Sequence, residues 1–281
     1  MNILIVGLGV IGGSIAKALK RSTGHKIYAI DTNEDTLLDA VSAGAIDSKA
    51  VVYDMGKMDL IYLCLYPDDC LEFMRSNGKY VKKGSIVTDT CGVKTLLCEH
   101  IPEMAEKYDF SFVAGHPMAG KEKSGFSESD PSIFSGASYI IVETEYLEKS
   151  GGKEAEDIVI NLAKDMGFAN IVRTTPEKHD DMIAFTSQVP HVLACAYVLS
   201  PLCKNHKGFS AGSYRDVSRV ADINAELWTR LFLDNRMPLA KELDTLISNI
   251  AGIKDAVEKN DETQLKELLK KAAQVKRSDN I

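Results

Sequence analysis

The chain has 281 residues, of which 45% are hydrophobic and 26% are charged, and its formal net charge is −7. This length is enough for two domains with buried cores. The acidic balance argues against nonspecific binding to nucleic acid, which needs a basic surface, and the sequence has no apolar run of about 18 residues that would predict a transmembrane helix.

The N-terminal stretch MNILIVGLGVIGGS is apolar but lacks the basic residues that begin a signal peptide. Its glycines favour a first strand followed by a turn. The six cysteines show no zinc-ligand spacing, and without a secretory signal we expect reduced thiols and a cytoplasmic location. They are Cys64, Cys70, Cys91, Cys98, Cys195 and Cys203.

Residues 1–173 alternate short, β-branched apolar runs with helix-like stretches. This alternation is typical of buried strands in a mainly parallel sheet whose strands are joined by helices. The predicted strands are Asn2–Val6, Lys26–Asp31, Leu60–Leu65, Ser85–Asp89, Ser111–Ala114, Tyr139–Val142 and Ile171–Thr174.

The strand signal fades after Thr175. A long helical pattern runs from Glu177 to Cys203, a Gly/Ser loop covers residues 208–213, and further helical segments cover Asn224–Ile253 and Glu262–Val275. The predicted fold is therefore α/β: a doubly wound, mainly parallel sheet in residues 1–173, followed by an all-α domain in residues 174–281.

A glycine-rich motif follows the first predicted strand. Residues 7–12 (GLGVIG) match the pattern G-x-G-x-x-G, and an amphipathic helical pattern follows over Ile11–Lys20. In a Rossmann-type domain the first glycine permits a tight turn, the second lets the backbone approach a pyrophosphate, and the third allows close helix–strand packing. The free N–H groups at the start of the helix then bind the phosphates.

Asp31 ends the second predicted strand, about 20 residues past the glycines, where a carboxylate binds the ribose 2′-hydroxyl. The same charge would repel a 2′-phosphate, so NAD is favoured over NADP. The alternative is that Asp31 only caps a helix beginning near Asn33. The predicted cofactor-binding residues are Gly7, Leu8, Gly9, Val10, Ile11, Gly12, Asp31 and Thr90.

Two further segments follow predicted strands. Thr90–Lys94 comes after Ser85–Asp89, and Gly115-His116-Pro117 comes after Ser111–Ala114. Both should lie at the carboxyl edge of the sheet, where ligands bind in this fold. Histidine exchanges a proton near neutral pH, so His116 is the candidate base beside the cofactor. The alternative is a structural histidine in a turn, and Cys91 is interpreted as a packing residue.

The helical half carries two more candidates. His191 follows Pro190, which lacks an N–H and should kink the long helix. Arg219 ends the segment YRDVSR after the Gly/Ser loop, and an arginine there could hold a carboxylate through two parallel hydrogen bonds. The alternatives are a core histidine and a solvated surface charge.

Taken together, these motifs resemble the prephenate and arogenate dehydrogenase family. The matching positions include residues 115–120 (GHPMAG) and, in the second half, Val189-Pro190-His191, residues 216–219 (DVSR) and Trp228. Between them, Glu122, Ser124, Gly125, Phe134 and Gly136 extend the resemblance, which spans nearly the whole chain in the right order.

The resemblance implies that prephenate and NAD are converted to 4-hydroxyphenylpyruvate, carbon dioxide and NADH, in tyrosine biosynthesis. It implies that His116 accepts the proton of the ring hydroxyl, that Arg219 binds a substrate carboxylate and that His191 meets the substrate side chain. Glu122 and Trp228 match residues near the site entrance. A homodimer formed through the helical domain is also implied, and no metal site is predicted.

The chain departs from the family pattern at two positions. Many members have a serine where Gly92 stands, and its hydroxyl orients the catalytic histidine; here Thr90, Cys91 or a water could take that part. Many members also have a histidine where Gln188 stands, which leaves the choice between prephenate and arogenate open.

Two other functions compete with this interpretation. A β-hydroxy acid dehydrogenase or imine reductase of similar architecture generally relies on a lysine in the helical domain, but Lys178 and Lys204 lie only at the ends of the predicted long helix. A noncatalytic NAD-sensing regulator would not need the set His116, His191 and Arg219.

Overall fold

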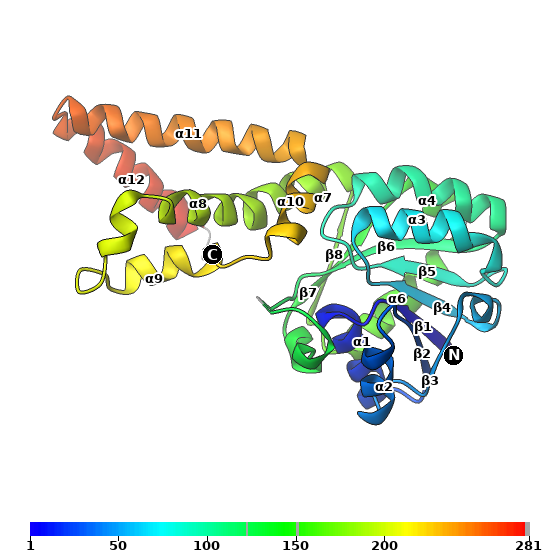
Figure 1. Cartoon of the computed structure of the whole chain (residues 1–281). Helices are drawn as coiled ribbons and strands as arrows, with labels where there is room; N and C mark the ends of the chain where they lie inside the picture. The colour runs from blue at the N-terminus through cyan, green and yellow to red at the C-terminus, as the bar shows by residue number, and fades with distance from the viewer. Residues whose placement is uncertain (122, 150–151, 279–281) are drawn as a thin grey trace.

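The computed structural model describes residues 1–121, 123–149 and 152–278. One sheet has the strand order β3-β2-β1-β4-β5-β6-β7-β8, and helices pack on both of its faces. The helices that follow residue 175 lie together to one side of the sheet (Figure 1). This arrangement confirms the predicted α/β fold with a helical second half.

The strands and the helices that connect them occupy residues 2–174. The strands are β1 (Asn2–Val6), β2 (Lys26–Ile30), β3 (Ser48–Lys49), β4 (Leu60–Leu63), β5 (Ile86–Asp89), β6 (Ser111–Pro117), β7 (Ser138–Val142) and β8 (Asn170–Thr174). The helices are α1 (Val10–Ser22), α2 (Glu34–Ser42), α3 (Pro67–Asn77), α4 (Thr95–Tyr108), α5 (Glu145–Lys149) and α6 (Lys153–Asp165).

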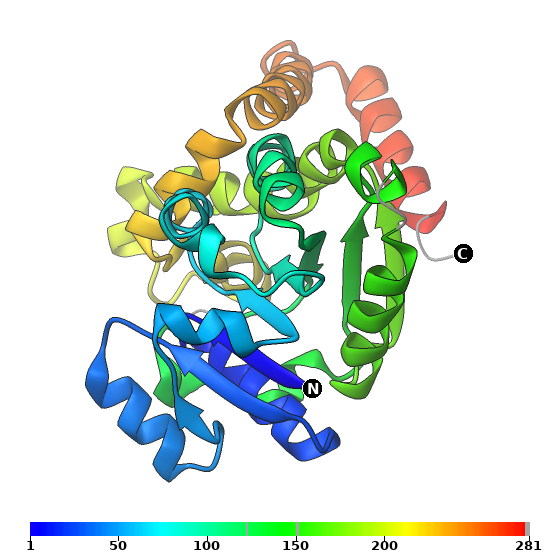
Figure 2. The ribbon, with the colours of Figure 1, turned by 90° about the vertical axis from the view of Figure 1, so that its right-hand side faces the viewer.

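The central strand β1 is buried on both faces. Ile3 and Ile5 belong to the core on one face, with side chains of α1 and α6, whereas Leu4 and Val6 belong to the core on the other face, with side chains of α3 and α4. Successive side chains of a strand point to opposite faces, so an uninterrupted apolar run is what a doubly covered parallel strand requires. Figure 2 shows these layers from the side.

The order in which the chain adds strands to the sheet reverses at β1. The chain adds β2 and β3 on one side of β1, then returns to add β4 and the later strands on the other side. In sheets of this kind ligands bind at that point, outside the carboxyl ends of the strands. The expected place for a ligand is therefore beside the turn that follows β1.

The structure differs from the prediction at the carboxyl end of β6. The predicted strand stopped at Ala114, which placed His116 in a following turn, but β6 continues to Pro117 and His116 pairs with Ile140 of β7. The β6–β7 pair is antiparallel, unlike the other neighbouring pairs of the described sheet. Gly115 and Pro117 hid this extension, since both residue types are depleted in strands.

The helical half contains α7 (Pro176–Ile183), α8 (Val189–Val198), α9 (Gly212–Ser218), α10 (Ala225–Asp234), α11 (Arg236–Glu258) and α12 (Glu262–Ser278). A π-helical turn over Ala184–Gln188 joins α7 to α8. Pro190 lies in the first turn of α8, so the predicted kink takes the form of a π-helical turn that accommodates the missing N–H.

The predicted helix Asn224–Ile253 is divided in two. Asn235 leaves the helical conformation, with φ −107° and ψ 27°, and separates α10 from α11. Its side chain is buried and donates hydrogen bonds to the carbonyl of Asp180 and to Oε1 of Gln188. A tertiary contact therefore decides where α10 ends. Within the described ranges, no helix has the length and apolar character needed to cross a membrane.

Candidate active site

The glycine motif forms the turn that its sequence predicts. Gly7 has φ +93°, a left-handed conformation that favours glycine, and a Cβ on Gly12 would lie 2.0 Å from the carbonyl oxygen of Gly7. A Cβ on Gly9 would meet no described atom within 4 Å, and Gly9 is exposed. Gly7 and Gly12 therefore shape the turn, whereas Gly9 leaves open space above it.

The first turn of α1 faces this space. The helix begins at Val10, and no hydrogen bond from a side chain of the described residues caps its N-terminus. Val10 and Ile11 are half-buried, and the first N–H groups of a helix have no partner within the helix itself. Together with the space above Gly9, these groups fit a pyrophosphate.

Asp31 supports the same turn. One carboxylate oxygen accepts a hydrogen bond from the backbone N–H of Leu8 at 2.7 Å, and the other accepts one from Asn33 at 2.8 Å. The cap of α2 is Asn33, whose side chain accepts from the backbone N–H of Thr36, so the alternative that Asp31 caps this helix is wrong. Each carboxylate oxygen keeps a lone pair for a ribose hydroxyl.

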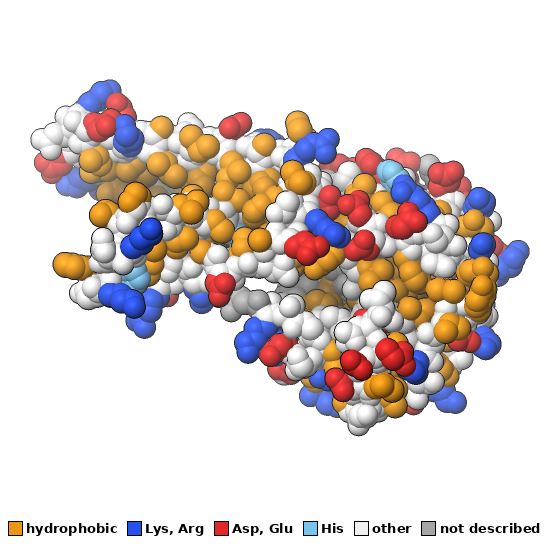
Figure 3. Space-filling view, viewed as in Figure 1, with side chains coloured by type: hydrophobic (Ala, Val, Ile, Leu, Met, Phe, Trp, Pro, Cys, Tyr) orange, Lys and Arg blue, Asp and Glu red, His pale blue; other side chains and the backbone are white. Residues whose placement is uncertain are grey.

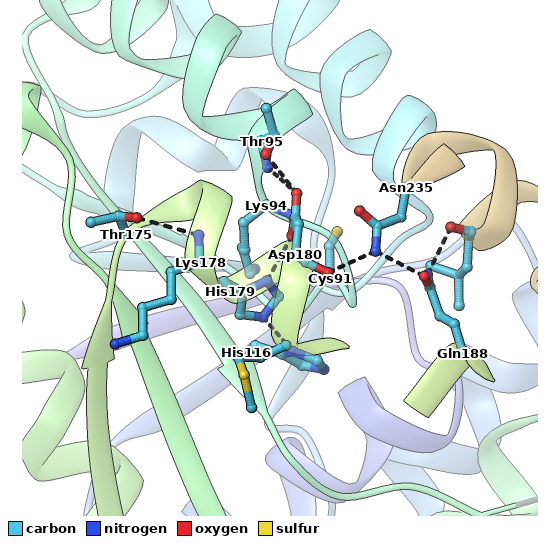
Figure 4. Close-up of polar contacts among 12 residues, drawn as sticks. Cys91, Lys94, Thr95, His116, Thr175, Lys178, His179, Asp180, Gln188 and Asn235 are labelled. Atoms are coloured by element: carbon cyan, nitrogen blue, oxygen red, sulfur yellow. Dashed lines mark hydrogen bonds and ion pairs between the residues drawn. The ribbon is translucent and has the colours of Figure 1, made fainter. Parts of the chain in front are cut away.

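His116 makes its polar contact with a residue that the sequence analysis missed. Nδ1 of His116 lies 2.9 Å from Nε2 of His179, and Nδ1 of His179 lies 2.7 Å from Oδ1 of Asp180 (Figure 4). His179 and Asp180 lie on α7, each only 2% exposed. The sequence signal that could have found them is the adjacent His179-Asp180 at the start of the predicted helical half.

The order of these contacts determines which ring nitrogens carry protons. The carboxylate of Asp180 only accepts, so Nδ1 of His179 donates to it and its Nε2 is left as an acceptor. Nδ1 of His116 must then donate to His179, which leaves Nε2 of His116 as the free acceptor. His116 is partly exposed. The ring is therefore set to receive a proton at Nε2.

Asp180 is fixed by the N-terminus of α4. It accepts hydrogen bonds from the backbone N–H groups of Lys94 at 2.8 Å and Thr95 at 2.9 Å, and from Oγ1 of Thr95 at 2.6 Å. A carboxylate at a helix N-terminus is stabilised by these N–H groups and by the helix dipole. Asp180 thus caps a helix of the first half from a helix of the second half.

A buried ion pair lies behind His116. The side chains of Lys94 and Asp89 are both 0% exposed, and the ammonium of Lys94 donates to Asp89 and to the carbonyl of Gly115. Asp89 also accepts from the backbone N–H groups of Cys91 at 2.9 Å and Gly115 at 3.2 Å. The pair therefore holds the backbone on which His116 is carried.

These surroundings keep His116 neutral. Burial among protein atoms, the charge of Lys94 and the neighbouring His179 hold the pKa of His116 well below its usual range. Burial also lowers the pKa of His179, although Asp180 opposes that effect. Burial works against ionisation of Asp180, but the hydrogen bonds from His179 and Thr95 outweigh it and lower its pKa.

The two side chains considered for orienting His116 make hydrogen bonds elsewhere. Oγ1 of Thr90 donates to the carbonyl of Leu63 at 3.4 Å, and Sγ of Cys91 donates to the carbonyl of Leu65 at 3.5 Å. A hydrogen bond with Cys70 and burial raise the pKa of Cys91, in keeping with a packing role. Gly92 faces α10, where a Cβ would meet Leu231 at 3.5 Å.

Three predicted substrate residues lie on neighbouring elements. They are His191 on α8, Arg219 on the turn over 219–221 and Trp228 on α10. Nδ1 of His191 donates to the carbonyl of Val220 at 2.8 Å, and its ring lies 3.7 Å from that of Trp228, measured between centroids. Arg219 directly precedes Val220 and is exposed. Glu122, the remaining predicted residue, lies outside the described residues.

Gln188 has a structural task. It is 1% exposed, donates to the carbonyl of Leu231 at 3.0 Å and accepts from Asn235 at 2.8 Å. These bonds tie the π-helical turn to the end of α10, which carries Trp228. Gln188 is therefore buried between α8 and α10 and serves packing rather than ligand contact.

Family models agree with this geometry. The nucleotide-binding domain of prephenate dehydrogenase matches residues 15–172, and the dimerization domain of the same enzyme matches residues 175–271. The chain belongs to the prephenate dehydrogenase family. A relative named prephenate dehydrogenase, from Bacillus subtilis, is 30% identical over 278 residues, which cover 94% of this chain and 72% of the relative.

Solved structures of the family have the same fold. The prephenate dehydrogenase from A. aeolicus, in complex with hydroxyphenyl propionate and NAD+, has a TM-score of 0.84 and 28% identity, with coverage of 100% of this chain and 98% of that one. The Synechocystis arogenate dehydrogenase has a TM-score of 0.83 and 25% identity, with full coverage of both chains. The predictions of an NAD-dependent dehydrogenase and of the Rossmann-type fold are confirmed.

Proposed function

We propose that this chain catalyses the oxidative decarboxylation of prephenate to 4-hydroxyphenylpyruvate, with NAD as the acceptor and His116 as the base. The observation that carries this proposal is the neutral imidazole of His116, whose free Nε2 lies at the carboxyl edge of the sheet. A base in that position can take the proton of a ring hydroxyl while the carbon that bears it is oxidised.

The cofactor residues have separate tasks. Gly7 and Gly12 shape the turn, Gly9 leaves room for the pyrophosphate, the first N–H groups of α1 bind it, and Asp31 holds the ribose. Thr90 lies where β5 ends, at the same edge. When bound, NAD supplies the acceptor for the hydrogen and electron pair that leave C4 of the substrate ring.

The reaction leaves the proton count unchanged. The ring hydroxyl gives its proton to Nε2 of His116 as C4 is oxidised. The electron pair of the bond to the departing carboxylate enters the ring, carbon dioxide leaves, and the oxygen on C4 regains a proton to give the phenol. His116 therefore has to accept a proton and then return it.

The residues of the helical half bind the rest of the substrate. Arg219 pairs with a carboxylate, because its guanidinium can donate two parallel hydrogen bonds. His191 meets the substrate side chain, and the ring of Trp228 packs against His191. Gly92 lines the site across from Leu231, and Glu122 lies near the entrance.

One observation supports arogenate as a second candidate substrate. His191 uses Nδ1–H to donate to Val220, so in its neutral form Nε2 is an acceptor. An acceptor suits the ammonium of arogenate, whereas prephenate carries a keto group there and would need a donor.

We further propose that residues 1–173 and 174–281 form the two domains, and that the second forms a homodimer. Hydrophobic side chains gather along α8 and α11 (Figure 3), and several are exposed on the helical elements of this half. They include Phe185, Tyr197, Met237, Ile247, Ile250 and Val257. An apolar surface of this kind is typical of a protein interface. The cytoplasmic location stays a prediction.

The direct test is the initial rate of reduced-cofactor formation, followed by absorbance, with prephenate and arogenate, each against NAD and NADP. We expect the highest kcat/KM with prephenate and NAD. A higher value with arogenate would transfer the proposal to that substrate, and no turnover of either would contradict it.

A further inference from the structure

We infer that His179 and Asp180 form a proton relay behind His116, which holds the proton taken from the substrate until the product oxygen takes it back. This inference rests on the proposed function. His179 acts through His116, so it is a positioning and relay residue rather than one that touches the substrate.

The geometry provides a continuous path. The two ring nitrogens lie 2.9 Å apart, and the second ring lies 2.7 Å from a carboxylate oxygen. When Nε2 of His116 receives the substrate proton, its Nδ1 proton can pass along the existing hydrogen bond to Nε2 of His179. His116 is then neutral again, and the imidazolium is on His179, with its Nδ1–H still bonded to Asp180.

The charges favour this transfer. The groups that face the two rings are Lys94 at the N-terminus of α4, Asp89 at the end of β5 and Asp180 on α7. A positive charge on His116 would face Lys94 without a carboxylate in direct contact. The same charge on His179 would pair with Asp180 at hydrogen-bond distance. The second ring is therefore the better place for the proton.

Return of the proton follows the same path in reverse. After decarboxylation the product oxygen is a phenolate, which draws a proton from Nε2 of His116, and His179 then restores Nδ1–H of His116. The path ends at Asp180, whose carboxylate already accepts from the N–H groups of Lys94 and Thr95, so the proton enters and leaves through Nε2 of His116. The relay thus fits a reaction in which the enzyme accepts a proton from the substrate and returns it to the product.

The first test uses the pH dependence of kcat and kcat/KM in His179→Gln and Asp180→Asn. Glutamine can still accept the hydrogen bond from Nδ1 of His116 but cannot carry its proton, so we expect kcat to fall about 10-fold. The acid limb of kcat/KM should move to lower pH in both variants, because the proton must then sit on His116 beside Lys94. His25→Gln, at a distant and half-buried position, is the matched control and should change neither quantity.

An acid limb that stays in place in both variants would overturn the relay, whatever happens to kcat, because a purely structural role lowers the rate without moving the titration. NAD affinity, measured by fluorescence, shows whether each variant is folded.

A second measurement uses the unaltered chain without substrate, so it stands even if the proposed function fails. In spectra of the protein labelled with ¹⁵N-histidine, we expect the rings of His116 and His179 to titrate together, with His179 charged first. The His116→Gln spectrum assigns the two rings. Independent titrations, or a first proton on His116, would overturn the relay.

Discussion

The network around His116 and the surface around His191 differ in how completely this chain supplies their contacts. In the network, the side chains of Asp89, Lys94, His179 and Asp180 are buried, and each makes hydrogen bonds to the others or to nearby backbone. Figure 4 shows the contacts of His179 and Asp180. Around His191, the side chains are partly or fully exposed. The network proposed for proton transfer is therefore complete within one chain, whereas the surface proposed to bind the substrate is left open.

This difference has a physical reason. Buried polar groups are costly unless they are paired, so a network that sets a proton's position must be complete before the substrate arrives. A binding surface must release its ligand, and exposed groups such as Arg219 can be desolvated by the ligand itself. Three substitutions test the comparison.

The largest effect is expected at the base. His116→Asn should lower kcat at least about 100-fold, because proton transfer by a positioned side chain contributes about 10²- to 10⁴-fold. NAD affinity should stay nearly unchanged, since the glycine turn and Asp31 are remote from the substitution in sequence and make their own contacts. Steady-state rates and NAD titration check both, and near-normal kcat would mean that another group is the base.

The next effect is on stability. Lys94→Met removes the partner of the buried Asp89 and should lower the free energy of unfolding by about 3–5 kcal/mol. Lys82→Met is the matched control, because the Lys82–Asp59 pair is partly exposed and should contribute less than about 1 kcal/mol. Denaturant unfolding of both variants gives the comparison. Equal losses would show that the network is no more important to folding than a surface pair.

The smallest effect is expected on the open side. Arg219→Ala should raise the KM for prephenate about 10-fold or more, because a hydrogen bond to a charged group contributes about 1.5–3 kcal/mol. Arg215→Ala, on the exposed surface of α9, is the control and should leave KM unchanged. An unchanged KM in Arg219→Ala, measured with saturating NAD, would place the substrate carboxylate elsewhere.

Some features of the site can be predicted from local sequence because they depend on local geometry. The glycines of residues 7–12 determine a turn through backbone conformation and close contact, and Asp31 follows at the end of the next strand. The helical pattern around Pro190 indicates an irregular helix, although only the structure shows that the irregularity is a π-helical turn.

Other features depend on contacts between distant segments. His116 lies in a strand because β7 pairs with it, and α10 ends at Asn235 because that side chain bonds to Asp180 and Gln188. In each of these pairs the two residues are at least 24 positions apart in the sequence, so no local pattern contains both partners. Gln188, which stands where many family members have a histidine, is occupied by contacts of this kind.

The sequence by itself determined the alternation of strands and helices in the first half and the glycine turn, since these follow from apolar periodicity and glycine geometry, and side-chain chemistry proposed His116 as the base. Only the tertiary structure decided how His116 is held. The expected serine is replaced by Gly92, and the partner comes from α7, 63 residues further along the chain. Folding brings the first turn of α4 and the His179–Asp180 pair together, because a buried carboxylate needs the N–H groups that a helix N-terminus provides.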